Sequence, residues 1–88
     1  MFRLEKYTSS DSIPVSAQGV AEKSVDITPI SGYIPVGCVQ INTNNGYCSI
    51  SKNYIYSNGK LSITFANVRS STATISNLEY WILYLKSN

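Results

Sequence analysis

The C-terminal segment NLEYWILYLKSN would be apolar on both faces if it formed a β-strand. Successive side chains of a strand point to opposite sides, so a strand with one wet face alternates apolar and polar residues. One face of this segment carries Leu78, Tyr80, Ile82 and Tyr84, and the other carries Trp81, Leu83 and Leu85. A chain of 88 residues builds only one small core, so it can cover one of these faces. We therefore expect the second face to pack against a neighbouring subunit.

The two faces differ in chemistry, which suggests which of them meets the neighbour. A Tyr hydroxyl can stay near water at the rim of an interface, so we expect the Trp81 face in the core and the tyrosine face at the subunit contact. The expected interface residues are Leu78, Tyr80, Ile82 and Tyr84. Only 14% of the residues are charged, against an average of about 25%. Such a small charged fraction is consistent with a chain that buries part of its surface in an oligomer.

The rest of the chain indicates short strands separated by turns. No window holds the i, i+3, i+4, i+7 spacing of an amphipathic helix, and Val, Ile and Thr are abundant. The expected strands are 2–7, 12–18, 20–27, 34–42, 47–51, 53–57, 60–67 and 73–86. This pattern predicts an all-β sandwich or barrel, and we expect an antiparallel, jelly-roll-like β-sandwich.

The dipeptide Asn58-Gly59 is the strongest hairpin signal in the chain. A two-residue type I′ turn at this point would pair Tyr56 with Leu61. Tyr54 and Tyr56 would then share the core face of the hairpin with Leu61. The alternative interpretation is that these tyrosines bind a ligand.

The two cysteines, Cys38 and Cys48, are expected to be small buried apolar residues rather than a disulfide. A turn centred near Asn44-Asn45 would leave the two sulfurs out of register with each other, whereas a disulfide needs them face to face. Two Cys and no His cannot complete a four-ligand zinc site in one chain.

Several classes of function lack their usual residues. The chain has no His, its five acidic residues are isolated, and no glycine-rich phosphate loop or calcium loop occurs. We therefore expect no enzyme activity, no metal and no cofactor. The seven basic residues are scattered and the net charge is +2, which is a weak electrostatic case for an oligonucleotide-binding barrel. We expect no nucleic-acid partner, and no apolar run is long enough for membrane insertion.

Candidate ligand contacts are the tyrosines and asparagines beside turns, where binding residues concentrate. Tyr33 and Tyr47 are the tyrosines in such positions. Asn44 and Asn45 belong to a polar run that could hydrogen-bond sugar hydroxyls. Turn chemistry alone is the other interpretation of this run.

Residues 15–88 resemble the C-terminal domain of tail-fibre and minor structural proteins of phages of Gram-positive bacteria. The resemblance lies in the order of short motifs: a strand with an Ala-x-Gly turn, then SGYIPVG, a Tyr-rich hairpin, Asn67 in FANVRSSTATI, and the ending WILYLKSN. The chain departs from the family at Cys38 and Gln40, where the family has an aliphatic strand. Its loop NTNNG is also shorter than the family's loops, which reduces the surface for a ligand.

The resemblance implies a β-sandwich tip domain that forms a homotrimer at the distal end of a phage tail appendage. Such a domain would be part of the virion, assembled in the host cytoplasm, and would contact carbohydrate on the host surface. Residues 15–88 would form the tip domain, and residues 1–14 would be a strand, a connector or a swapped arm. The alternative function is a stand-alone carbohydrate-binding β-sandwich module of a bacterial protein, which would be a monomer with one exposed aromatic platform.

Overall fold

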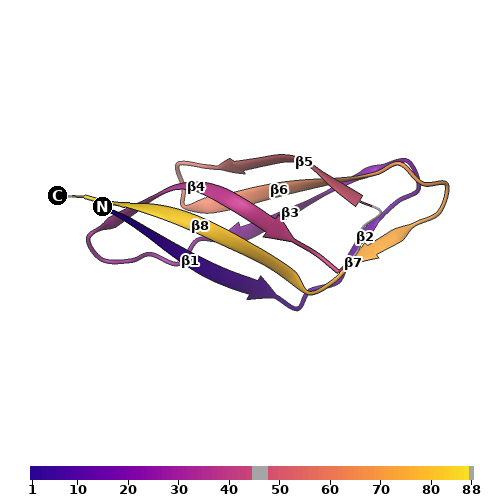
Figure 1. Ribbon diagram of the computed structural model, residues 1–88. Coiled ribbons are helices and arrows are strands. Elements are labelled where there is room, and N and C mark those ends of the chain that lie inside the picture. Colours follow the sequence, from indigo (N-terminus) through magenta and orange to yellow (C-terminus); the bar gives the residue numbers. More distant parts are fainter. Residues whose placement is uncertain (45–47, 88) are drawn as a thin grey trace.

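The computed structural model describes residues 1–44 and 48–87, and this part of the chain folds into eight strands (Figure 1). Their bounds are β1 (Phe2–Ser9), β2 (Ile13–Val15), β3 (Val20–Asp26), β4 (Tyr33–Asn42), β5 (Cys48–Ile55), β6 (Lys60–Asn67), β7 (Ala73–Ile75) and β8 (Leu78–Lys86). Every pairing between these strands is antiparallel. The predicted all-β class with antiparallel sheets is therefore confirmed.

The strands pair in a nested order. β1 pairs with β8, β2 with β7 and β3 with β6, so the first three strands run beside the last three as one bent ribbon. β4 joins the outside of β8 and β5 joins the outside of β6. The result is two three-stranded sheets, β1–β8–β4 and β3–β6–β5, with the short pair β2–β7 at one end (Figure 1). Met1 and Lys86 lie together at the other end, which we call the terminal end, and the Lys86 N–H donates to the Met1 carbonyl at 2.9 Å.

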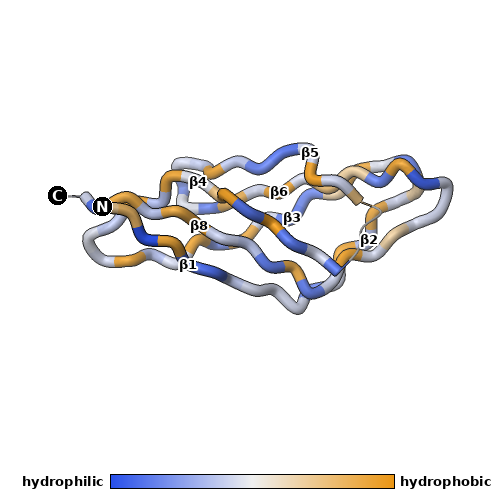
Figure 2. The backbone as a smooth tube through the Cα atoms, in the orientation of Figure 1, coloured by the Kyte–Doolittle hydropathy of each residue, from blue (hydrophilic) through white to orange (hydrophobic). Residues whose placement is uncertain are grey.

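The core lies between the two sheets. The inner face of β8 meets the inner face of β6, and the short pair closes one end. Hydrophobic and hydrophilic residues alternate along much of the strands, as one inner and one outer face require (Figure 2). The buried apolar side chains at the centre are Leu61, Ile63 and Phe65 of β6 with Leu78, Tyr80, Ile82 and Tyr84 of β8.

The predicted assignment of the two faces of the last strand is therefore wrong. Leu78, Tyr80, Ile82 and Tyr84 are buried inside a single chain and cannot form the subunit contact. The reason is that the Tyr84 hydroxyl has partners in the core. It donates to the Thr28 carbonyl at 2.8 Å and lies 2.7 Å from the Tyr7 hydroxyl. A buried hydroxyl with two partners needs no water.

The β5–β6 hairpin has a three-residue loop where the sequence predicted a two-residue loop. The Gly59 N–H donates to the Tyr56 carbonyl at 3.1 Å, and the Tyr56 N–H donates to the Lys60 carbonyl at 2.8 Å. Gly59 has a φ of 82°, whereas Asn58 is not among the residues with positive φ. A type I turn followed by a left-handed glycine has this geometry, and a type I′ turn would need positive φ at both positions.

The longer loop moves the register of β5 by one residue. Ile55 now pairs with Leu61, and a shift of one residue sends every side chain to the other face. Ile55 packs against the core, while Tyr54 and Tyr56 are 52% and 43% exposed. The prediction that these two tyrosines belong to the core is wrong.

Other boundaries differ in detail. β5 is one strand where two were expected, with an irregularity between Ile50 and Lys52. The expected strand 73–86 breaks into β7 and β8 beside Asn77, which has a φ of 53°. The expected domain boundary after residue 14 falls within β2, and β1 pairs with β8 along its whole length.

The two cysteines lie on β4 and β5, which are consecutive strands in different sheets. The hairpin pairing of these strands that the sequence suggested is therefore absent from the described sheets. Both cysteines are free thiols, partly buried against the core. Burial raises the pKa of Cys38.

Asn67, at the end of β6, joins the turn after β2 to the loop after β6. Its side-chain N–H groups donate to the carbonyls of Val15, Ser16 and Ser71 at 3.1, 3.3 and 2.9 Å. Its side-chain oxygen accepts the Arg69 N–H at 3.0 Å. Asn67 is 2% exposed, so these partners replace water.

We expect the variant Asn67→Ala to lower the free energy of unfolding by about 3 kcal/mol, because it leaves buried carbonyl groups without donors. Chemical denaturation at a fixed chain concentration measures this change. The matched control is Asn42→Ala at an exposed position of β4, which should stay within about 0.5 kcal/mol of the wild type. Equal stability of the two variants would contradict the role of Asn67.

Candidate functional site

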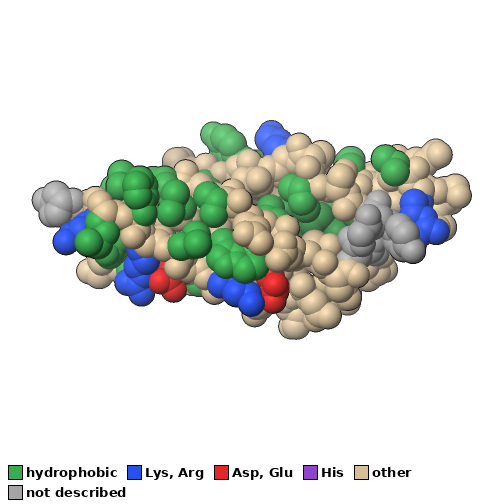
Figure 3. Space-filling model, viewed as in Figure 1, with side chains coloured by type: hydrophobic (Ala, Val, Ile, Leu, Met, Phe, Trp, Pro, Cys, Tyr) green, Lys and Arg blue, Asp and Glu red, His purple; other side chains and the backbone are tan. Residues whose placement is uncertain are grey.

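The outer face of the sheet β1–β8–β4 carries a group of exposed apolar side chains. We call this group the apolar face, and its members are Phe2, Leu4, Ile34, Val36, Val39, Trp81, Leu83 and Leu85. Trp81 and Leu83 are partly exposed, and the other six members are between 38% and 63% exposed. Figure 3 shows hydrophobic side chains gathered over β4 and β8 on this face, with charged side chains along its lower margin.

Strand register explains how the apolar face is built. Phe2 pairs with Leu85, and Leu85 pairs with Ile34, so these three residues form one row across the sheet at the terminal end. The next row holds Leu4 and Leu83. The face is therefore most apolar at the terminal end.

Towards the other end of the sheet the outer face becomes polar. Lys6 pairs with Trp81, and its ammonium group lies 5.6 Å from the centre of the Trp81 ring and 3.1 Å from the Glu79 carboxylate. Glu79 pairs with Thr8 and Asn42 in the last row. Lys6 and Glu79 thus mark where the apolar face ends.

Two irregularities in β4 add apolar side chains to this face. The register shifts between Pro35 and Gly37 and again between Cys38 and Gln40, which leaves Val36 and Val39 as extra residues. An extra residue in a β-bulge has no partner across the ladder. Val36 and Val39 are both at least half exposed. β4 is an edge strand, where bulges and proline are tolerated.

A groove of about 500 Å³ lies beside β4 at the terminal end, where the edges of the two sheets meet. No charged side chain lines it. The lining residues are Ile34, Pro35, Tyr54, Ile55, Tyr56, Ser57 and Gly59. Ile34 belongs to both the groove and the apolar face, so the two surfaces are continuous.

The two exposed tyrosines of the groove pack against each other. The ring centres of Tyr54 and Tyr56 are 4.9 Å apart and the rings are inclined by 66°, an edge-to-face pair. The Lys52 ammonium group lies 5.9 Å from the centre of the Tyr54 ring. These contacts hold two aromatic side chains at the surface, which is the feature expected of an interaction site.

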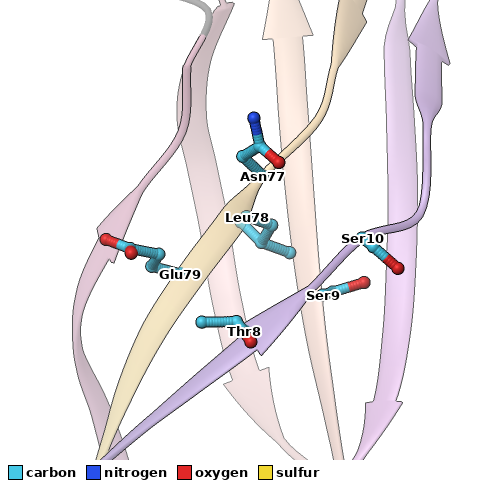
Figure 4. Close-up of a pocket in the computed structure, with 6 residues that line it drawn as sticks. All are labelled: Thr8, Ser9, Ser10, Asn77, Leu78 and Glu79. Atoms are coloured by element: carbon cyan, nitrogen blue, oxygen red, sulfur yellow. The ribbon is translucent and has the colours of Figure 1, made fainter.

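A second hollow, of about 280 Å³, lies near the start of β8 and is more polar. Its lining residues are Thr8, Ser9, Ser10, Asn77, Leu78 and Glu79 (Figure 4). Figure 4 shows the side chains of Glu79 and Ser10 pointing to opposite sides. The Glu79 carboxylate is paired with Lys6, and the Ser9 hydroxyl accepts the Asp11 N–H at 3.3 Å. The polar side chains of this hollow therefore do not all point to one centre.

The two predicted ligand contacts that the structure describes, Tyr33 and Asn44, lie far apart. Tyr33 begins β4 and Asn44 follows its end, roughly 30 Å away at about 3.3 Å per residue. Tyr33 packs near Arg3, whose guanidinium carbon lies 5.7 Å from the ring centre. Tyr47 and Asn45 lie outside the described residues.

Asn44 is occupied by turn contacts. Its side-chain N–H₂ donates to the Ser76 hydroxyl at 2.7 Å, and its side-chain oxygen accepts the Ser76 N–H at 3.1 Å. These bonds tie the end of β4 to the bend between β7 and β8. Of the two interpretations of the asparagine run, the contacts of Asn44 fit turn chemistry.

Within residues 1–44 and 48–87 no group of three or more His, Cys, Asp or Glu side chains could hold a metal ion. The same residues contain no helix that is long and apolar enough to cross a membrane. Comparison of the chain with models of known protein families, with curated proteins and with solved structures finds no match.

Sequence reasoning missed the location of the apolar face and of the groove. A signal for the face was present in β1, where Phe2 and Leu4 alternate with Arg3 and Glu5. That alternation indicates one apolar and one charged side, although it does not say which side lies outward. The groove had no such signal, because its tyrosines depend on the length of the β5–β6 loop.

The buried Tyr84 gives the chain a characteristic response to alkaline pH. Burial raises the pKa of Tyr84 well above the ordinary value of 10.0, and its hydrogen bond with Tyr7 adds to the shift. Above about pH 10 the unfolded chain loses this proton while the folded chain keeps it. The free energy of unfolding therefore falls as pH rises beyond that point.

We expect Tyr84→Phe to lower the free energy of unfolding at pH 7 by about 1–2 kcal/mol, because the Thr28 carbonyl and the Tyr7 hydroxyl lose their partner. Between about pH 10 and 11 the variant should lose less stability than the wild type does. Denaturation curves at pH 7 and in the alkaline range test both points, with Tyr54→Phe as an exposed control at pH 7. An equally steep alkaline loss in Tyr84→Phe would contradict the assignment.

Proposed function

We propose that this chain is a non-catalytic structural and receptor-binding domain whose copies associate through the apolar face. The observation that carries the proposal is the apolar face itself. Exposed apolar side chains gathered on one face of a folded chain are typical of an interaction surface, whereas scattered single residues need no explanation. The face also explains why β8 is apolar on both sides.

The proposed assembly is a homotrimer of antiparallel, jelly-roll-like β-sandwiches at the tip of a phage tail fibre. The strands β1, β2 and β3 pair in turn with β8, β7 and β6, and they form two layers around one core. This nested pairing supports the jelly-roll-like description. The trimer and the place in the virion rest on the resemblance of residues 15–88 to tail-fibre tip domains. Contact with carbohydrate on the host surface rests on the same resemblance.

The residue types of the chain support a non-catalytic role. The chain has no His, and the polar hollow near the start of β8 has no converging acid and base. The acidic residues at the surface are paired with Lys or Arg in several places, as in Arg3–Glu5 and Lys6–Glu79. Such pairs are typical of a solvated surface.

A stand-alone carbohydrate-binding module is the second candidate. The observation in its favour is the exposed pair Tyr54 and Tyr56 beside the groove, which could form an aromatic platform for a sugar ring. This function predicts a monomer, whereas the tip domain predicts an assembly.

Native mass spectrometry and light scattering of the wild type separate the two candidates. We expect a species of three times the 9.7 kDa chain mass. We expect Val36→Glu to weaken the assembly by at least about 100-fold, because an unpaired charge in a dry interface costs about 3 kcal/mol or more. Val36 is half exposed in the single chain, so the variant should still fold.

The matched control is Val20→Glu, the same exchange at an exposed position of the other sheet. This variant should keep the mass of the wild type. A monomeric wild type at high concentration would favour the carbohydrate-binding module. A Val36→Glu variant that assembles as the control does would remove the apolar face from the contact.

A further inference from the structure

The two edges of the apolar face differ in the surface that they offer to a neighbour. On the β1 edge Phe2 and Leu4 project from the sheet and are 63% and 54% exposed. On the opposite edge, β4 borders the uncharged groove that contains Tyr54 and Tyr56. One edge therefore offers apolar side chains and the other offers an apolar recess.

The two features also lie at the same height along the strands. Phe2, Leu85 and Ile34 form one row across the sheet, and Ile34 lines the groove. Consider two copies related by rotation about an axis parallel to the strands. Phe2 of one copy would then lie level with the groove of the next copy without any shift along that axis. A contact between two different patches closes into a ring when it needs rotation alone, and forms a filament when it also needs a shift.

We propose that the β1 edge of one copy, led by Phe2 and Leu4, inserts into the groove beside Tyr54 and Tyr56 of the next copy, and that this contact closes a ring. The proposal rests on the proposed function, since it names the contact through which the copies associate. The occupant of the groove is thus a second copy of this chain.

The chemistry of the two surfaces agrees. An aromatic ring entering beside Tyr54 and Tyr56 can make edge-to-face contacts with them, and Pro35 and Ile55 offer further apolar surface. Arg3 lies between Phe2 and Leu4, but its side chain is on the other face of the strand and is paired with Glu5 at 2.5 Å. The Arg3 charge is therefore paired within its own chain.

A saccharide fits the groove less well than an apolar edge does. Sugar sites combine an aromatic platform with several polar groups that converge on the hydroxyls. The lining here offers only the hydroxyls of Tyr54, Tyr56 and Ser57 among its side chains. The continuity of the groove with the apolar face through Ile34 also favours an occupant that covers both.

Disulfide cross-linking tests the contact. In a chain with Cys38→Ala and Cys48→Ala, the pair Phe2→Cys and Tyr56→Cys is introduced, and the folded protein is oxidised. Phe2 lies on β1, whereas Tyr56 follows β5 of the other sheet and lines the groove beside β4. β4 is already two strand spacings from β1, about 9–10 Å, so we expect a bond within one chain to exceed the reach of about 7 Å between Cα atoms. We expect covalent dimers and trimers on a denaturing gel without reductant.

The matched control combines Phe2→Cys with Val20→Cys and should remain a single chain on the gel. As a second measurement, Tyr56→Ala in the otherwise unaltered chain should weaken the assembly at least about 10-fold. Tyr56 is 43% exposed, so this variant should keep its fold.

Several results would overturn the proposal. Covalent dimers from Phe2→Cys alone would show a symmetric β1–β1 contact, and an assembled double variant that does not cross-link would place the contact elsewhere. In both cases the proposed function would stand, whereas a monomeric wild type would overturn both. If Tyr56→Ala keeps the wild-type mass but abolishes binding of an N-acetylglucosamine tetramer, the groove belongs to a saccharide.

Discussion

The structure depends on β8 (Leu78–Lys86), the central strand of its sheet and the source of four core side chains. Hydrogen bonds join β8 to β1 on one side and to β4 on the other. Its inner face packs against β6 and so holds the two layers together. The Tyr84 hydroxyl extends this role, because it links β8 to Tyr7 of β1 and to the segment before β4.

The same strand also determines which apolar residues are left on the surface for an interaction. Once one face of β8 is used in the core, the apolar residues of the other face stay at the surface, and neighbouring strands enlarge the surface they form. β1 adds Phe2 and Leu4 by simple alternation, and β4 adds Val36 and Val39 through its bulges. This arrangement leaves a broad apolar surface on one sheet, which is the basis of the proposed association with other chains.

Much of the fold could be predicted, because turn residues and alternation mark the strands locally. The assignment of the faces of β8 could not, since the partners of the Tyr84 hydroxyl lie 77 and 56 residues away in the chain. Tyr54 and Tyr56 were predicted to lie on the wrong face of their strand. One extra residue in the loop shifts the register by one, and this shift turns every side chain of the strand to the opposite face. Tyr33 and Asn44 were both chosen as ligand contacts because they lie beside turns, but a strand of ten residues separates those turns.

Trp81 gives the most direct measurement of the central claim, that a sister chain covers the apolar face. It is the one tryptophan of the chain and lies on that face. Its fluorescence can be followed while the protein is diluted from the assembled state, with acrylamide as the quencher. We predict emission at short wavelength and weak quenching at high concentration, and a red shift with stronger quenching on dilution. Emission and quenching that do not change while the measured mass falls from assembly to single chain would contradict the claim.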